Sequence, residues 1–209
     1  MPDLLFTGTQ EARLTLVLAH GAGAAMDSAW MNAMSDKLAG RGVRVVRFEF
    51  AYMAARRSGQ RKPPPRAETL LGEYRDAVAA LGQTNGLFIG GKSMGGRVAS
   101  MVAEELFGQG TIAGLVCLGY PFHPPGKPEK LRTAHLKRLA VPTLICQGMR
   151  DPFGTREEVL SYELSSEIAV DWLEDGDHDF KPRKPLTLEA NLDAAATEIA
   201  AWMRKIAAE

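Results

Sequence analysis

The stretch GLFIGGKSMGG, residues 86–96, constrains the fold of this chain most strongly because it fits two incompatible patterns. The phosphate-binding pattern G-x-x-x-x-G-K-[ST] is matched by Gly86, the four residues after it and the triplet GKS. The letters GKSMG fit G-x-S-x-G, in which a serine, here Ser93, lies on a sharp turn between a strand and a helix. The first pattern predicts a loop that wraps a nucleotide, and the second predicts the nucleophile of an acyl-transfer reaction.

The residues between Gly86 and the GKS triplet favour the second pattern. They read LFIG and make up most of the only strand available before the next helix. If they wrapped a phosphate, three large apolar side chains would lose burial worth about 1.5–3 kcal/mol each. We therefore predict a strand, then Ser93 at the turn, then a helix from Met94. Small residues at Gly91 and Gly95 would let the strand and the helix approach closely.

Short apolar strand patterns and amphipathic helix patterns alternate along the rest of the chain. Strands are expected at residues 13–18, 43–50, 87–90, 112–118, 143–147 and 168–173, and helices at 28–39, 67–81, 94–107, 156–164 and 188–206. This alternation predicts an α/β fold, a mostly parallel central sheet with helices on both faces. A length of 209 residues fits one domain, 1–209, and the run RKPPPR is expected to be a surface loop rather than a linker.

An acid and a histidine follow Ser93 in the order that an acyl-transfer site needs. The segment LICQGMRDPFG reads as a strand and a turn that carries Asp151, and VDWLEDGDHDF as a strand and a turn that carries His178. These features predict Ser93 as the nucleophile, His178 as the general base and Asp151 as the acid that orients it. The alternative role for Ser93 is to cap the helix that begins at Met94.

Two backbone N–H groups are expected to stabilise the oxyanion, those of Met94 and Ala22. Ala22 belongs to the HGAG loop, which follows the strand at 13–18, where hydrolases place their second donor. Gly23 in the same loop is the substitute for Ala22 and a candidate substrate contact.

The other candidates for these roles have weaker positions. His20 is expected to brace the HGAG loop, whereas His123 and His135 lie in a loop with no strand end to hold them. Three acids beside His178 are expected to be solvated or to form turns: Asp175, Asp177 and Asp179. Lys92 is expected to face solvent or to form an ion pair. No metal or other cofactor is expected, because DGDHD has no second ligand cluster at a fixed spacing.

With these motifs in place, the chain resembles the α/β-hydrolases over nearly its whole length. The stretches LAHGAGAAMDS, GGKSMGGR, QGMRDPFG and GDHDF are most similar to a small group of that superfamily. The group contains dienelactone-hydrolase-like bacterial proteins, testis-expressed hydrolase-like proteins and the hydrolase-like domain of a subunit of the NSL histone acetyltransferase complex. The resemblance implies an α/β-hydrolase fold with Ser93, Asp151 and His178 as the catalytic residues, and it implies no substrate.

The segment 119–141, where many hydrolases insert a cap domain, is short and rich in proline and glycine. We therefore expect no cap domain and an open, shallow site. Tyr120 and Phe122 are expected to form one wall of that site. The alternative is that both side chains only anchor the loop to the core.

Composition excludes several partners and locations. The chain has 25 basic and 25 acidic residues, so its net charge gives no reason to expect nucleic acid or a membrane as a partner. No stretch approaches the roughly 20 apolar residues of a membrane span, and the start MPDL lacks the pattern of a secretory signal. Two cysteines are too few for a disulfide framework. A cytoplasmic location is expected, and the oligomeric state stays open.

Three segments nevertheless concentrate positive charge near the ends of strands: the loop 51–66, the loop after Tyr120 and the residues after His178. Their basic residues are Arg56, Arg57, Arg61, Lys62, Arg66, Lys127, Lys130, Arg132, Lys137, Arg138, Lys181, Arg183 and Lys184. These cations could surround the site and attract an anionic substrate or an acidic partner. The alternative is that they point into water as ordinary loop residues.

Two classes of function follow from the sequence. The first is a serine hydrolase that cleaves a small-molecule ester, thioester or lactone through an acyl-enzyme intermediate. The second is a hydrolase-fold protein that binds a partner with little catalytic activity. Ser93, Asp151 and His178 together favour the first class, because a scaffold has no physical need for all three.

Overall fold

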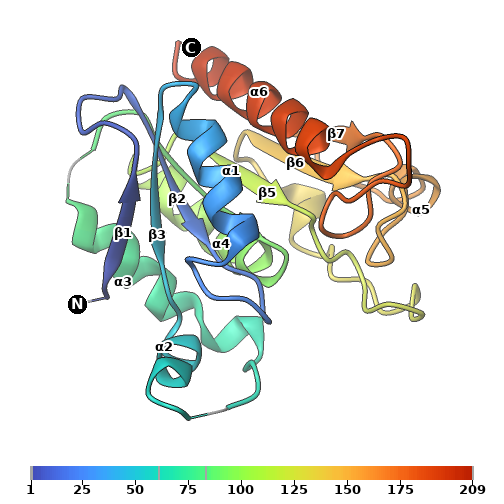
Figure 1. Cartoon of the computed structure of the whole chain (residues 1–209), viewed down its shortest axis with the longest axis horizontal. Helices are drawn as coiled ribbons and strands as arrows, with labels where there is room; N and C mark the ends of the chain where they lie inside the picture. Colours follow the sequence, from blue (N-terminus) through green and yellow to red (C-terminus); the bar gives the residue numbers. More distant parts are fainter. Residues whose placement is uncertain (1, 61, 83, 209) are drawn as a thin grey trace.

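The computed structural model describes residues 2–60, 62–82 and 84–208. Within these residues the strands form one seven-stranded sheet in the order β1-β3-β2-β4-β5-β6-β7 (Figure 1). The strands are β1 (Leu4–Thr7), β2 (Leu14–Ala19), β3 (Val43–Phe48), β4 (Leu87–Lys92), β5 (Gly114–Leu118), β6 (Thr143–Gly148) and β7 (Ile168–Leu173). Only β1 runs antiparallel to its neighbour, so the mostly parallel sheet is confirmed.

Helices cover both faces of this sheet. They are α1 (Ala29–Ala39), α2 (Ala51–Arg57), α3 (Leu71–Leu81), α4 (Met94–Gly108), α5 (Arg156–Leu160) and α6 (Leu188–Ile206), with short 3-10 turns at Ala67–Thr69 and Leu136–Arg138. Helices α1 and α6 pack together on one face, and α3 and α4 pack together on the other (Figure 1). No helix of the described residues is long and apolar enough to cross a membrane.

Side chains of the central strands alternate between the two faces, as the two-residue period of a strand requires. In β2, Leu16 and Leu18 pack with α1 and α6, whereas Val17 and Ala19 pack with α3 and α4. All six residues of β2 are buried, as expected for a strand covered on both sides. This double burial holds the carboxyl ends of the strands, and the loops that leave them, in fixed positions.

Two elements of the structure, strand β1 and helix α2, are not predicted by the sequence pattern. Strand β1 is a four-residue edge strand whose Phe6 stays exposed, so it lacks the continuous apolar pattern of a buried strand. Helix α2 lies in the segment expected to be only a basic loop, and it buries Tyr52 and Met53. The run after it forms no helix or strand over its described residues, and Arg61 lies outside them.

The strand order reverses direction between β2 and β4. The chain leaves β2 toward β3 on one side, and it leaves β4 toward β5 on the other. Open parallel sheets bind ligands at such a point, outside the carboxyl ends of the strands. Ser93 follows β4 and the HGAG loop follows β2, so both segments lie at this position.

Candidate active site

Ser93 lies between the end of β4 and the start of α4 in a strained backbone conformation, with φ 52° and ψ −116°. Such a positive φ is rare for a residue with a side chain. Two glycines make the turn possible. A Cβ on Gly91 would lie 2.3 Å from the carbonyl carbon of Gly95, and a Cβ on Gly95 would lie 2.6 Å from the carbonyl oxygen of Ala19. The predicted strand–turn–helix arrangement is therefore present.

The phosphate-loop interpretation is wrong for this chain. Residues Leu87–Lys92 are all buried in the sheet, paired with β2 on one side and β5 on the other. Their backbone groups form ladder hydrogen bonds and are not free to wrap a phosphate.

The structure brings Ser93, His178 and Asp151 together from the loops after β4, β7 and β6. Nε2 of His178 lies 2.8 Å from Oγ of Ser93, and Nδ1 lies 2.8 Å from Oδ2 of Asp151. The side chain of Asp151 is fully buried, and that of His178 is 19% exposed. The imidazole thus connects a buried carboxylate to a hydroxyl at the surface of the cavity.

Two supporting residues were missed by the sequence analysis. Gln147, the penultimate residue of β6, donates from its buried amide to Oδ2 of Asp151 at 2.9 Å and accepts from the N–H of Tyr120 at 2.8 Å. Phe153 lies with its ring 4.2 Å from that of His178, and its N–H donates to Oδ1 of Asp151. Gln147 and Phe153 hold the Asp151 carboxylate and the His178 imidazole in place. In the sequence, the glutamine near the end of a strand and shortly before Asp151 was the signal that could have identified Gln147.

The carboxylates of Asp175 and Asp177, beside His178 in the sequence, form contacts with other residues. Oδ1 of Asp177 accepts from the N–H groups of Asp179 and Lys181, which forms a turn. Asp175 pairs with Arg183 and Arg150. The hydrogen bonds of the Asp177 carboxylate are these turn contacts. The expectation that Asp177 forms a turn is therefore confirmed.

The two residues expected to supply the oxyanion donors border the cavity that holds Ser93. Ala22 and Met94 both line it, and no described residue accepts a hydrogen bond from either backbone N–H. The loop of Ala22 is held by Tyr52, whose O–H donates to the Ala22 carbonyl at 3.0 Å. His20 braces the same loop as expected: its Nδ1 donates to the Gly21 carbonyl and its Nε2 accepts from the N–H of Phe50. Burial lowers the pKa of His20, which keeps it neutral.

Gly23, the substitute donor, is exposed and is absent from the residues that line this cavity. The cavity has a volume of about 490 Å³. Its lining residues are Ala22, Pro64, Pro65, Arg66, Ala67, Glu68, Ser93, Met94, Arg97, Pro121, Arg132 and Phe153.

Tyr120 and Phe122 do not form a wall of the site. Both side chains are fully buried, and the Tyr120 hydroxyl donates to the Arg132 carbonyl at 3.0 Å. The alternative interpretation is therefore right: both rings anchor the loop to the core. They are turned inward because the ring of Tyr120 packs on Phe122, which packs in turn on Tyr162. Pro121, between them, lines the cavity instead.

Lys92 is buried rather than solvent-facing, although it does form the alternative ion pair. Its Nζ donates to the main-chain carbonyl of His178 at 2.7 Å, lies 3.2 Å from Oδ1 of Asp179 and stands over the ring of Trp30. Burial lowers the pKa of Lys92, whereas Asp179 raises it. Lys92 therefore tethers the His178 loop to the end of β4, next to Ser93.

Replacing Lys92 by methionine is expected to lower kcat about tenfold and to leave KM nearly unchanged, because small displacements of a catalytic group cost rate. Steady-state kinetics on an activated ester measures this split. The matched control is Lys37→Met, which removes a lysine paired with Glu189 and Asp193 on α6. Equal kcat values for Lys92→Met and the wild type would show that the tether does not position His178.

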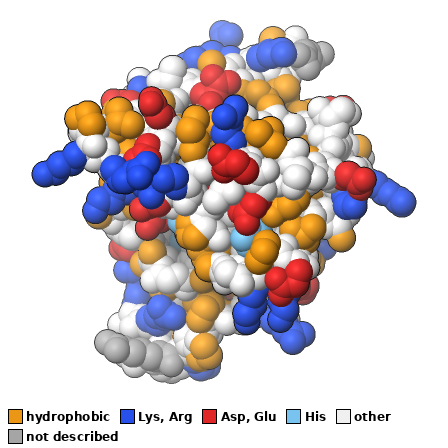
Figure 2. Space-filling view, turned by 90° about the vertical axis from the view of Figure 1, so that its right-hand side faces the viewer, with side chains coloured by type: hydrophobic (Ala, Val, Ile, Leu, Met, Phe, Trp, Pro, Cys, Tyr) orange, Lys and Arg blue, Asp and Glu red, His pale blue; other side chains and the backbone are white. Residues whose placement is uncertain are grey.

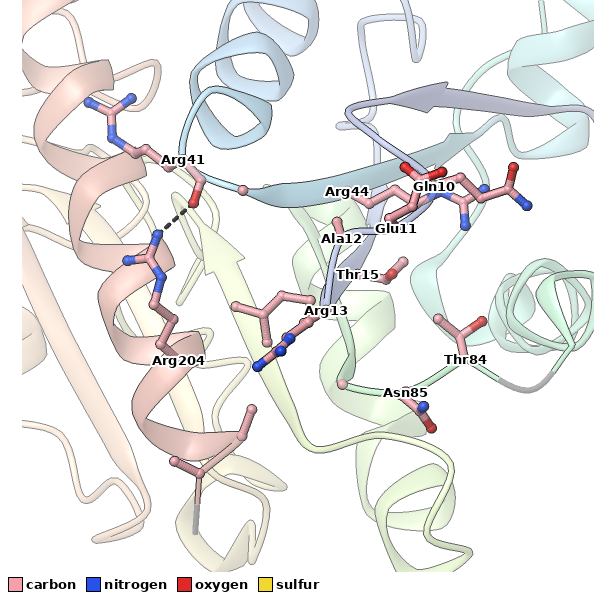
Figure 3. Close-up of a pocket in the computed structure, with 15 residues that line it drawn as sticks. Gln10, Glu11, Ala12, Arg13, Thr15, Arg41, Arg44, Thr84, Asn85 and Arg204 are labelled. Atoms are coloured by element: carbon pink, nitrogen blue, oxygen red, sulfur yellow. Dashed lines mark hydrogen bonds between the residues drawn. The ribbon is translucent and has the colours of Figure 1, made fainter.

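A larger cavity of about 1070 Å³ lies at the opposite edge of the sheet, where the parallel strands begin (Figure 3). Arg13, Thr15, Arg44 and Asn85 line it from the starts of β2, β3 and β4 (Figure 3). It contains none of the residues that surround Ser93. We assign no catalytic or binding role to this larger cavity.

The remaining histidines lie away from Ser93. His123 contacts Glu158, and His135 contacts the hydroxyl of Ser100. Among the described residues, no three His, Cys, Asp or Glu side chains converge as metal ligands would. Cys117 and Cys146 are buried, unpaired thiols, and burial raises the pKa of both.

This strand order, with a serine on a strained turn after β4, an acid after β6 and a histidine after β7, defines the α/β-hydrolase class. Residues 12–204 match the family described as an alpha/beta hydrolase domain, so the chain belongs to that family.

Solved structures with a similar fold agree with this assignment. A dienelactone hydrolase from Anabaena variabilis has a TM-score of 0.74 at 19% identity, over 98% of this chain and 91% of that one. An α/β serine hydrolase without a lid from Xanthomonas campestris has a TM-score of 0.69 at 19% identity, over 95% and 89%. A monoacylglycerol lipase from Paleococcus ferrophilus has a TM-score of 0.70 at 17% identity, over 97% and 99%. The resemblance to cap-less, dienelactone-hydrolase-like members is confirmed, and at these identities it concerns the fold.

Proposed function

We propose that this protein is a serine hydrolase that cleaves a small-molecule ester, thioester or lactone. The observation that carries the proposal is the continuous chain of contacts from Asp151 through His178 to Ser93 on the strained turn. A structural serine has no need of a buried acid and an imidazole in line with its hydroxyl. The names of the solved neighbours, which include a dienelactone hydrolase and a monoacylglycerol lipase, support an ester-cleaving function.

In the first half of the reaction, Oγ of Ser93 attacks the substrate carbonyl carbon while its proton passes to Nε2 of His178. The carbonyl electron pair moves to the oxygen, which accepts hydrogen bonds from the N–H groups of Met94 and Ala22. Collapse of this intermediate expels the alcohol or thiol, which takes the proton from Nε2. An acyl group remains on Ser93.

In the second half, a water molecule gives a proton to Nε2 of His178 and attacks the acyl carbon. The second oxyanion collapses, the acid leaves, and the proton returns to Ser93. Asp151 keeps Nδ1 protonated and offsets the charge of the imidazolium, and its burial makes that interaction strong. The cytoplasmic location expected from the sequence stays a prediction.

Labelling by a fluorophosphonate probe tests the proposal directly. We expect the wild-type protein to be labelled at Ser93 within minutes and to hydrolyse a panel of aryl esters of increasing acyl length. Mass spectrometry of the digested adduct locates the label. A folded protein that is neither labelled nor active on any ester would overturn the proposal and would favour a binding role for the hydrolase fold.

A further inference from the structure

Three arginines line the cavity that contains Ser93: Arg66, Arg97 and Arg132. They come from the loop before α3, from the first turn of α4 and from the loop after β5. Glu68 is the single acid among the lining residues. The wall of the cavity therefore carries more positive than negative charge, although the chain as a whole is neutral.

Arg97 is only partly compensated. One terminal nitrogen of its guanidinium pairs with Glu68, while its Nε is buried without a hydrogen-bond partner among the described residues. It stands four residues after Ser93, in the first turn of α4. The positive end of the helix dipole also lies there, so Glu68 offsets only part of the positive charge at this end of the cavity.

Arg132 has no acid partner among the described residues, but its backbone is firmly held. Its N–H donates to the Phe122 carbonyl at 2.7 Å, and its own carbonyl accepts from the Tyr120 hydroxyl. Burial and the neighbouring charge of Arg97 lower the pKa of Arg132. Arg97 and Arg132 thus line the same cavity, where an anion between them would stabilise both positive charges.

Several other basic residues of the loops near the site are already neutralised. Arg57 pairs with Glu49 and Asp27, Lys137 pairs with Glu163, and Arg183 pairs with Asp175. On the face shown in Figure 2, basic side chains are scattered among acidic ones, and histidine atoms are visible near the centre. Specific recognition of an anion is therefore expected from the cavity arginines and not from the wider basic loops.

We propose that the substrate of this site carries a carboxylate besides the bond that is cleaved, and that Arg132 and Arg97 bind this carboxylate, with Arg66 at the rim. The inference rests on the serine hydrolase function proposed above. A guanidinium presents two parallel N–H groups that match the two oxygens of a carboxylate. Binding it also supplies the partner that Arg132 lacks.

Two matched esters test the inference: 4-nitrophenyl hydrogen adipate, which carries a free carboxylate, and its neutral methyl ester. At low salt we expect kcat/KM of the wild type to be about tenfold higher for the anionic ester, since fixed charge at a cleft raises the local concentration of the opposite charge. Added sodium chloride should reduce this preference, while kcat/KM for the neutral ester stays constant.

The variant Arg132→Gln should lose most of the preference, because its kcat/KM should fall more for the anionic ester than for the neutral ester. Its matched control is Arg13→Gln, which removes one positive charge from the opposite edge of the sheet (Figure 3). The control should keep the full preference. Because Arg132 has no acid partner among the described residues, replacing it leaves no buried carboxylate without a partner.

The outcomes separate the inference from the proposed function. Equal kcat/KM and equal salt profiles for the two esters in the wild type would overturn the inference and leave the serine hydrolase in place. Loss of the preference in Arg13→Gln as well would also overturn it, because net charge alone would then be responsible. Labelling of Ser93 without hydrolysis of the anionic ester contradicts the inference alone. Absence of both labelling and hydrolysis removes the proposed function and the inference with it.

Discussion

Replacing Ser93 by alanine is expected to lower kcat for an activated ester by about 10⁶-fold, the loss typical of removing a nucleophile that acts as one unit with its base. Ser93 supplies the one hydroxyl of this turn that contacts the His178 imidazole, whereas Lys92 contacts only the main-chain carbonyl of His178. Stopped assays with long incubation times measure the residual rate.

The control for this variant uses the strained backbone of the turn. Ser93→Ala keeps the Cβ and therefore the strain, whereas Ser93→Gly removes both the hydroxyl and the strain at φ 52°. We expect Ser93→Gly to be inactive but more stable than Ser93→Ala by about 1 kcal/mol in chemical denaturation, the lower end of the cost of such a conformation. Substantial activity in either variant would remove Ser93 from the role of nucleophile.

Replacing Asp151 by asparagine is expected to lower kcat by about 10⁴-fold, because a neutral amide no longer holds the imidazole in the required tautomer. The surroundings add to the effect. Oδ1 of Asp151 accepts from the N–H of Phe153, and Oδ2 accepts from Gln147 and lies against Nδ1 of His178. An amide nitrogen in either position would face a donor. Steady-state kinetics and the rate of fluorophosphonate labelling both measure this loss.

Asp177→Asn and Asp179→Asn are the matched controls for the acid. Asp177 forms a turn, and Asp179 is an exposed partner of Lys92, so each change should lower kcat by less than about tenfold. A mild effect of Asp151→Asn together with a severe effect of either control would move the acid to another position.

The sequence predicts the framework of the site well because each part of it depends on local pattern. The apolar run before Ser93 has to be a strand, and the glycines around Ser93 allow a turn that larger residues would block at 2.3–2.6 Å. Asp151 and His178 follow apolar strands whose parallel pairing brings their loops to one edge of the sheet. The order and spacing of these three residues along the chain are therefore sufficient to predict that they meet.

The remainder depends on packing, which no local pattern specifies. The side chains of Tyr120 and Phe122 point inward because Phe122 packs on Tyr162 and the Tyr120 hydroxyl donates to the Arg132 carbonyl. Lys92 is buried because the His178 loop folds over it and offers a carbonyl. Arg97 pairs with Glu68 because α4 packs against the 3-10 turn Ala67–Thr69. Contacts between segments far apart in the sequence decide each of these positions.

The short connection between β5 and β6 has a consequence for the timing of the proposed reaction. Its described residues form a loop and one short 3-10 turn, with no element that could close over Ser93. Enzymes with closing lids often wait for the lid to open before product leaves. In the serine hydrolase proposed above, bulk water would reach the acyl-enzyme without such a step, so hydrolysis would compete directly with transfer of the acyl group to other alcohols. For that proposed hydrolase we expect the chemical steps on Ser93, and not the opening of a gate, to limit turnover.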